Sequence, residues 1–232
     1  MKTNLSLLKA SAVAFFLFIS GSAFSATYYT CAGTTLNLAP SAAPANITYS
    51  WDIKKDGTST GVVTTAPTSF ADAGVYEVIL LSTAATGSGV CAPDPVSNEI
   101  IVLPALTVAL TAPTTTYCEG LGDATSSVIT PTAQSTTYST DVAFEYSYTI
   151  TRGGTNVTVA EAGTLDAATG VLTLNIKTPG EYSIVGSVKY IQASGNTTKP
   201  FLGAGCPATS GTPTTITVTA KPTQPTVTIT AS

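Results

Sequence analysis

The sequence predicts an all-β protein made of two β-sandwich domains with one disulfide in each. Three observations lead to this prediction. Apolar and polar residues alternate with a period of two in many short stretches, a series of motifs occurs twice in the same order, and the four cysteines divide evenly between the two copies. Helical spacing of apolar residues is nearly absent after residue 26.

The first 26 residues are predicted to be a secretory signal peptide. Lys2 and Lys9 accompany an apolar run over 10–19, and mostly small residues follow at 21–26. Later apolar runs are too short and too often interrupted to span a bilayer. We therefore expect an exported protein without a membrane span, located outside the cell or on its surface.

The charge balance argues against nucleic acid as a partner. Without the predicted signal peptide, seven basic residues stand against 13 acidic ones. A chain with this net negative charge repels the phosphate backbone. We expect no nucleic-acid binding.

The repeat consists of five kinds of motif. Each copy has a cysteine with a glycine two residues later, an aromatic strand that runs into a tight turn, a glycine-x-tyrosine strand, a cysteine in a loop with glycine and proline, and a closing strand of β-branched residues. In the first copy these are Cys31-Ala32-Gly33, 49–53 with Asp56-Gly57-Thr58, 74–78, 89–93 and 99–102. In the second they are Cys118-Glu119-Gly120, 146–150 with Gly153-Gly154-Thr155, 180–184, Gly205-Cys206-Pro207 and 215–218.

The domain boundaries follow from the repeat. A proline comes soon after each closing strand, at Pro104 and Pro222, where a short stiff linker is expected. The tail at 225–232 is similar to the stretch that opens the second copy. We therefore predict a signal peptide at 1–26, domains at 27–105 and 106–220, and a linker with the first strand of a truncated third repeat at 221–232.

The aromatic strands predict where each core lies. Trp51 and Tyr148 stand inside alternating strands, with small polar or charged neighbours on either side. Two sheets that are apolar on one face hide those faces by stacking about 10 Å apart. We expect Trp51 and Tyr148 in the middle of their respective cores rather than on a ligand-binding surface.

Four cysteines in an exported chain allow three pairings. The repeat favours Cys31 with Cys91 and Cys118 with Cys206, so that each bond ties the opening of a sandwich to its closing edge. The chain-entropy model gives about 4 kcal/mol for each such bond. No Cys-x-x-Cys motif is present, which argues against a redox-active pair.

The sequence offers little for catalysis. It contains no histidine, which removes the usual general base and the commonest zinc ligand. It has no nucleophile elbow, phosphate-binding loop or dinucleotide motif. The glutamates considered as a glycosidase pair are scattered over both copies: Glu99, Glu119, Glu145, Glu161 and Glu181. We predict no enzyme, no catalytic residue and no cofactor.

Extracellular β-repeats often bind calcium through loop carboxylates. Asp52 and Asp56 bracket a hairpin, but two lysines lie between them and the second copy has no carboxylate at those places. We therefore expect Asp52 and Asp56 to stabilise a turn. Asp94 with Asp123 is a weaker alternative. We therefore predict no metal site.

The motifs together resemble the Ig-like and PKD-like repeats of Bacteroidota surface proteins. The segment 72–76 is similar to the turn before strand F of immunoglobulin-type domains, and 179–182 resembles the variant of PKD domains. This resemblance implies an immunoglobulin-like β-sandwich fold. It also implies that the hydroxyls of Tyr76 and Tyr182 bond back to upstream backbone and close a corner. The cysteines depart from the antibody pattern, because they lie before strand B and after strand F.

The same resemblance implies a non-catalytic spacer or interaction repeat of an adhesin-type surface protein. Its partners would be a surface ligand, protein or glycan, and further repeats of the same chain. One alternative is a carbohydrate-binding accessory region of a secreted hydrolase, with exposed aromatic residues chosen from Tyr28, Tyr29, Tyr117, Tyr138 and Tyr190. Another is a pilus-like subunit in which 223–232 donates a strand to a neighbour.

Overall fold

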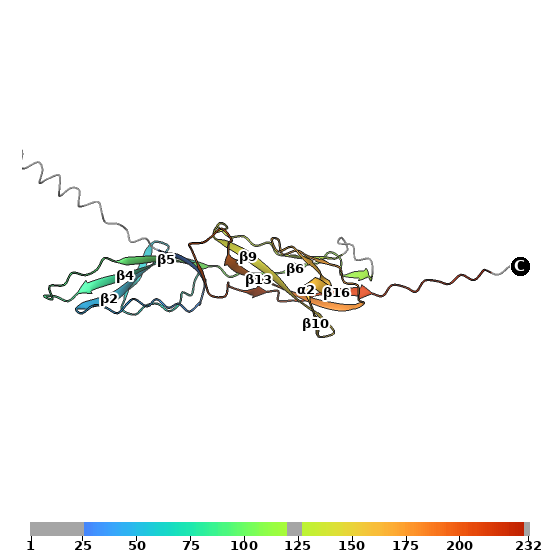
Figure 1. Cartoon of the computed structure of the whole chain (residues 1–232), viewed down its shortest axis with the longest axis horizontal. Coiled ribbons are helices and arrows are strands. Elements are labelled where there is room, and N and C mark those ends of the chain that lie inside the picture. Colours follow the sequence, from blue (N-terminus) through green and yellow to red (C-terminus); the bar gives the residue numbers. More distant parts are fainter. Residues whose placement is uncertain (1–25, 120–126, 230–232) are drawn as a thin grey trace, which may run out of the picture. The chain divides into compact units, whose positions relative to one another are not determined.

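The computed structural model describes residues 26–119 and 127–229 (Figure 1). The predicted signal peptide, apart from Ala26, and the last three residues of the predicted third repeat lie outside the described residues. The chain forms two compact units. Unit 1 runs to Pro104 and also includes Thr198–Leu202, whereas unit 2 holds Ala105–Thr197 and the residues from Gly203 onward. In the described residues, no helix has the length and apolar character that crossing a membrane requires.

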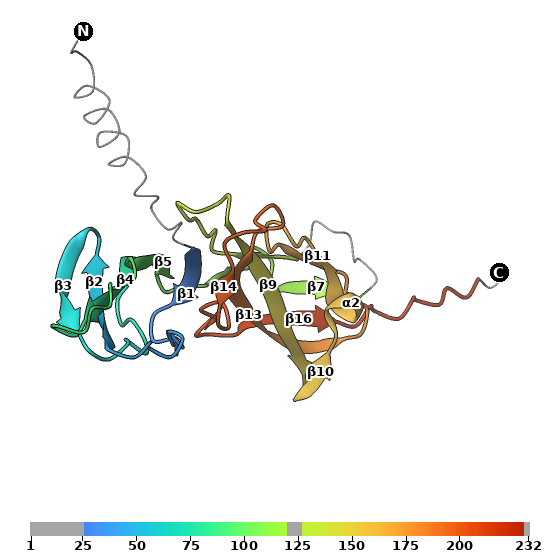
Figure 2. The same cartoon turned by 60° about the vertical axis from the view of Figure 1, so that its left-hand side comes forward.

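Unit 1 contains one six-stranded sheet. Its order is β14 (Phe201–Leu202), β1 (Thr27–Cys31), β5 (Val96–Leu103), β4 (Gly74–Ala84), β2 (Ile47–Lys55) and β3 (Thr58–Val63) (Figure 2). The central strands pair antiparallel, and β1 runs parallel to both β5 and β14. Alternating side chains point to opposite faces, so one face of the sheet carries the apolar set.

The second layer of unit 1 is irregular. No strand forms over 32–46 or 64–73, yet these segments pair through two backbone hydrogen bonds, Gly33 N to Phe70 O (2.8 Å) and Leu36 N to Thr68 O (2.7 Å). Prolines in both segments lack the N–H that a sheet ladder requires. The buried core between the layers consists of Leu36, Trp51, Ile53, Phe70, Tyr76, Val78, Ile100 and Val102.

Unit 2 is a sandwich of two sheets. One has the order β10 (Thr155–Val157), β9 (Val142–Arg152), β13 (Gly180–Gln192), β16 (Thr214–Thr219) and β7 (Thr116–Cys118). The other has the order β11 (Gly163–Leu165), β12 (Leu172–Leu174), β8 (Val128–Pro131) and β6 (Leu110–Thr111). The short β15 (Ala208–Thr209) pairs with β13, and α2 (Val159–Ala162) is a single turn. These orders are C′-C-F-G-A′ and D-E-B-A of an immunoglobulin sandwich.

The sheet of unit 1 and the five-stranded sheet of unit 2 share both strand order and register. From β1 through β3, unit 1 repeats the order A′-G-F-C-C′, with the first pair parallel in each case. Tyr76 lies opposite Lys55 and Ile100, and Tyr182 lies opposite Arg152 and Ile216. The described chain is therefore nearly all-β and immunoglobulin-like, as the sequence predicted.

The two aromatic residues expected at the core centres differ in burial. Trp51 is 7% exposed and belongs to the core of unit 1. Tyr148 is only partly buried and packs against the unit 2 core, most of whose buried residues are aliphatic. Its hydroxyl donates to the Gly170 carbonyl at 2.5 Å. Tyr148 therefore closes the edge of the core and does not occupy its middle.

The predicted disulfide pairing is wrong. Cys31 and Cys206 are disulfide-bonded, whereas Cys91 and Cys118 are free thiols. The reason is the long loop between β13 and β16. Part of this loop forms β14 beside β1, where Thr30 Oγ1 donates to Leu202 O at 3.1 Å. Cys206 follows β14 closely in the chain, and Cys31 directly follows Thr30.

Candidate functional site

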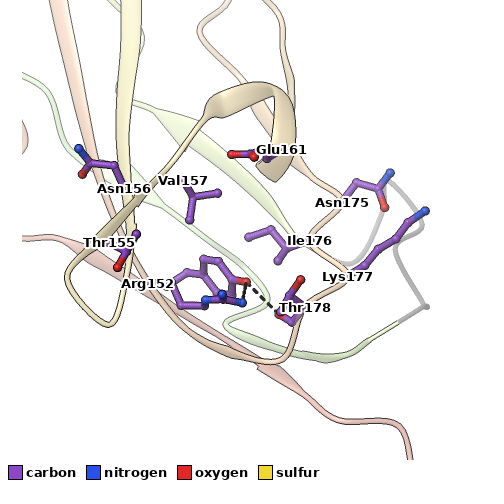
Figure 3. A pocket seen from close by; sticks show the side chains of 10 residues that line it. Arg152, Thr155, Asn156, Val157, Glu161, Asn175, Ile176, Lys177 and Thr178 are labelled. Atoms are coloured by element: carbon purple, nitrogen blue, oxygen red, sulfur yellow. Dashed lines mark hydrogen bonds between the residues drawn. The ribbon is translucent and has the colours of Figure 1, made fainter.

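A polar pocket of about 560 Å³ opens on unit 2 (Figure 3). It lies where β9, β10, α2 and the segment before β13 meet. The lining residues are Arg152, Thr155, Asn156, Val157, Glu161, Asn175, Ile176, Lys177, Thr178 and Tyr182. Val157 and Ile176 stand between Arg152 and Glu161, and the Lys177 side chain extends outward at the rim (Figure 3).

A tight hairpin places one wall of this pocket. Gly153 and Gly154 have φ angles of 54° and 81°, which suit the two central positions of a hairpin turn. The turn sets Arg152 opposite Thr155. Just beyond it, Glu161 Oε2 accepts from the Thr158 backbone N–H at 2.9 Å, and Glu161 N donates to Thr158 Oγ1 at 3.3 Å. These reciprocal bonds form a capping box at the start of α2.

The capping box also sets the state of the Glu161 carboxyl. Hydrogen bonds from the backbone and then the hydroxyl of Thr158 lower the pKa of Glu161. The group is therefore a carboxylate at neutral pH, with its oxygens engaged by its own helix cap. It caps the first turn of α2, and as a carboxylate it has no proton to donate as a general acid.

Arg152 is the single arginine of the chain and lies against the corner tyrosine. Its guanidinium carbon is 5.9 Å from the centre of the Tyr182 ring, and Nη1 donates to the Tyr182 hydroxyl oxygen at 3.4 Å. The Tyr182 hydroxyl in turn donates to Thr178 O at 2.9 Å. Among the described residues, Arg152 forms no ion pair with a carboxylate.

Unit 1 has a cation at the matching position, but there it is neutralised. Lys55 Nζ lies 5.7 Å from the centre of the Tyr76 ring, and the Tyr76 hydroxyl donates to Asp72 O at 3.1 Å. The Asp72 carboxylate accepts from Lys55 at 3.2 Å, which raises the pKa of Lys55. Thr178 holds the corresponding place in unit 2, four residues before the tyrosine. Among the described residues of unit 2, Arg152 therefore lines the pocket without a carboxylate in ion-pair contact.

Two of the four aspartates considered as calcium ligands make structural contacts. Asp52 accepts from Ser59 Oγ at 2.8 Å, and Asp56 accepts from the Val75 backbone N–H at 2.9 Å. Asp94 is exposed, and Asp123 lies outside the described residues. No cluster of three potential metal-ligating side chains occurs in 26–119 or 127–229.

Three of the five glutamates considered as a glycosidase pair have separate side-chain contacts. Glu119 accepts from the Lys221 backbone N–H at 3.0 Å, and Glu145 forms an ion pair with Lys189 at 2.9 Å. Glu161 belongs to the capping box described above. The pocket accordingly offers hydrogen-bond donors, the cations Arg152 and Lys177, and a carboxylate held in a helix cap.

Most of the tyrosines suggested as a stacking platform are buried. Tyr29, Tyr117 and Tyr190 have less than a tenth of their surface exposed and cannot stack on an external ligand. Tyr28 and Tyr138 are half-buried. Tyr28 lines a second, apolar pocket of about 450 Å³ in unit 1, together with Asn37, Leu38, Ala39, Pro40, Trp51, Leu80, Val96, Asn98, Ile100 and Leu202.

The sequence reasoning missed Arg152. The available signal was that the chain's single arginine directly precedes the Gly-Gly turn after the aromatic strand.

The segment 223–232, predicted to donate a strand to a neighbour, forms no strand over its described part. Val227 and Ile229 in this segment are 80% and 91% exposed.

No family model and no curated protein match this sequence. Among solved structures, the fibronectin(III)-like modules of Clostridium thermocellum CbhA are 18% identical, with 87% of this chain and 92% of that chain covered and a TM-score of 0.33. The human desmocollin-1 ectodomain is 12% identical, with 84% and 40% covered and a TM-score of 0.31.

A third similar structure is a SusE-like, surface-located polysaccharide-binding protein from the heparin utilisation locus of Bacteroides thetaiotaomicron. It is 9% identical, with 85% of this chain and 33% of that chain covered and a TM-score of 0.25. At these TM-scores the similarities carry no argument about what this chain binds. The immunoglobulin-like assignment therefore rests on the strand orders and registers of the two units.

Proposed function

We propose that this protein is a non-catalytic extracellular module, a spacer or interaction repeat of a bacterial surface protein. In this proposal residues 1–26 direct export, and 27–105 and 106–220 are copies of one ancestral domain. The remaining 221–232 begins a further repeat. The partners are a surface ligand and neighbouring domains of the same kind.

One observation carries the proposal: the same sheet, with the same strand order and register, is built twice. Corner tyrosines occupy equivalent positions and make equivalent hydrogen bonds, from Tyr76 to Asp72 O and from Tyr182 to Thr178 O. Repetition of a rigid architecture is how extended proteins gain length and binding surface.

The placement of charged groups also supports a non-catalytic role. Three ion pairs of the described residues, Lys54–Glu77, Lys55–Asp72 and Lys189–Glu145, lie on partly or largely exposed surface. Every buried side-chain nitrogen or oxygen in that part of the chain has a hydrogen-bond partner. Functional sites tend instead to hold strongly perturbed or unsatisfied groups.

Surface labelling of intact cells tests the proposed location. Cells that produce the protein from its own gene are probed with an antibody against unit 2 and treated with a non-permeant protease. The proposal predicts labelling without permeabilisation and loss of the signal after protease treatment. Labelling only in permeabilised cells would contradict it.

Glycan binding in the polar pocket is the second candidate, favoured by the uncompensated Arg152 beside amide and hydroxyl side chains. A glycan array with wild-type protein, Arg152→Ala and Lys55→Ala tests it. Lys55→Ala is the matched control, because Lys55 occupies the equivalent corner position in unit 1. Binding that is lost only in Arg152→Ala supports the candidate. Failure of the wild type to bind, or equal binding by all three proteins, rejects it.

A further inference from the structure

We propose that Cys118 of one copy of this chain forms a disulfide with Cys91 of another copy, so that copies join head to tail. The inference goes beyond the proposed surface role and does not depend on it. It rests on the positions of the four cysteines and on one open sheet edge.

Cys31 and Cys118 occupy equivalent positions. Each ends the A′ strand of its sheet and each lies opposite the corresponding residue of the G strand, Leu103 for Cys31 and Thr219 for Cys118. Both strands pair in parallel with that G strand. Cys31 is disulfide-bonded, but Cys118 is a free, partly exposed thiol whose contact is Thr219 Oγ1 at 3.5 Å.

Cys206 and Cys91 are also equivalent. Each lies in the loop between the F and G strands, which are β13 and β16 around Cys206 and β4 and β5 around Cys91. Each follows shortly after a glycine with positive φ, 88° at Gly205 and 69° at Gly89. Cys206 is bonded to Cys31, whereas Cys91 is exposed and free.

The bond already present in the chain therefore joins an A′-strand cysteine to an F–G loop cysteine. The two free thiols are one of each kind. Cys118 is an A′-strand cysteine that has no F–G loop partner, and Cys91 is an F–G loop cysteine that has no A′-strand partner. A second copy supplies both missing halves.

The sheet edges give an independent reason to expect a partner at Cys118. In unit 1, β14 covers the outer edge of β1, next to Cys31, and Tyr29 N donates to Pro200 O at 3.0 Å. In unit 2, β7 is the outermost strand of its sheet and nothing in the described residues pairs with its outer edge. An open edge of this kind accepts another segment of extended chain.

The segment that would approach the β7 edge is the loop at 85–95 of the second copy. It has no regular strand, and its residues are exposed or half-exposed. Val90, next to Cys91, is 40% exposed. This loop is shorter than the one that carries Cys206, so the disulfide rather than a long strand pairing holds the contact.

The bond requires an oxidant. The Cys118 and Cys91 thiols together lose two protons and two electrons to a small disulfide such as glutathione disulfide, which leaves as two thiols. The new contact joins different surfaces of the two copies. It therefore leaves one free Cys91 and one free Cys118 at the ends of each assembly, and growth continues.

Two complementary variants of the full chain test the proposal. Cys91→Ser keeps only Cys118 free, and Cys118→Ser keeps only Cys91 free. Each variant by itself, and an equimolar mixture of the two variants, is incubated with glutathione disulfide. The products are then separated by mass on a gel without reductant. We expect a shift to twice the monomer mass in the mixture only, and a ladder of larger species from the wild-type chain.

Peptide mapping identifies the bond in the dimer. Cleavage after Glu77, Glu99 and Glu119 places Cys91 and Cys118 on different peptides, and the expected product links those two. An intact Cys31–Cys206 link in the same digest shows that the variants are folded. A mixture that stays monomeric, or dimers of either variant alone through Cys118–Cys118 or Cys91–Cys91, would overturn the proposal. Neither result bears on the surface-labelling test.

Discussion

At the scale of single residues, the corner tyrosines tie strand F to the turn before it. Tyr182 is 2% exposed, and its hydroxyl donates to Thr178 O within a corner closed further by Arg152. A single hydrogen bond of this kind contributes on the order of 1 kcal/mol, because water would satisfy the same groups in the unfolded chain.

Tyr182→Phe is therefore expected to lower the free energy of unfolding by about 1 kcal/mol. Urea denaturation followed by fluorescence measures the change. Tyr49→Phe is the control, since the Tyr49 hydroxyl has no hydrogen-bond partner among the described residues. Equal stability of Tyr182→Phe and the wild type would show that the hydrogen bond from the Tyr182 hydroxyl to Thr178 O does not stabilise the fold.

The raised pKa of Tyr148 should make the free energy of unfolding depend on pH in the alkaline range. Burial, followed by the nearby Tyr146, raises the pKa of Tyr148 from 10.0 to about 12. The unfolded chain therefore releases this proton first. The contribution of Tyr148 to stability is complete below pH 10.0 and is lost as the pH rises to about 12.

The measurement compares wild type with Tyr148→Phe by urea denaturation across that range. The wild type should be more stable below pH 10.0, and the difference between the two proteins should shrink as the pH approaches about 12. A difference that stays constant across this range would show that Tyr148 ionises at its ordinary pH in the folded protein.

The sequence predicted the corner tyrosines but not the charged contacts beside them. The motif before Tyr76 and Tyr182 is local, so the short chain segment itself carries the corner. The neutralisation of Lys55 by Asp72, and its absence at Arg152, depends on residues brought together across a sheet. Alternation within one strand does not reveal such a cross-strand comparison.

At the scale of elements, the two units differ most in the layer that covers the shared sheet. Unit 2 forms the regular strands β6, β8, β12 and β11, whereas unit 1 covers its core with irregular chain. Alternating residues predicted the shared sheet well, because β4, β9 and β16 contain the stretches 75–79, 144–148 and 214–218. The segment that forms β14 lacks such alternation, and its pairing with β1 is set by a contact distant in sequence.

Gly170 shows how one turn supports the regular layer of unit 2. Its φ is 74°, and an added Cβ would overlap the Tyr146 ring. Its carbonyl accepts from the Tyr148 hydroxyl. The turn before β12 therefore requires glycine for its backbone and for the space its missing side chain leaves.

Gly170→Ala is expected to lower the free energy of unfolding by more than about 1 kcal/mol, because it adds both left-handed strain and a steric clash. Thermal unfolding measures the loss. Gly195→Ala is the matched control, since an added Cβ there has no neighbour within 4 Å. Similar melting temperatures for the two variants would contradict the packing described around Tyr146.

At the scale of the whole molecule, the cysteines divide into a bonded pair and two free thiols. The repeat favoured one bond inside each copy, tying the opening of each sandwich to its closing edge. The insertion of Thr198–Leu202 into unit 1 changes this outcome. The polar pocket, in contrast, lies within unit 2 alone, and its lining comes from several segments separated in sequence.

A disulfide map of the monomer tests most directly whether Cys31 is bonded to Cys206 while Cys91 and Cys118 stay free. The oxidatively folded protein is alkylated, digested without reduction and analysed by mass spectrometry. The structure predicts a peptide pair linked through Cys31 and Cys206, with alkylated Cys91 and Cys118. A Cys31–Cys91 link together with a Cys118–Cys206 link would contradict the placement of β14 beside β1 and the proposal for the free thiols that depends on it.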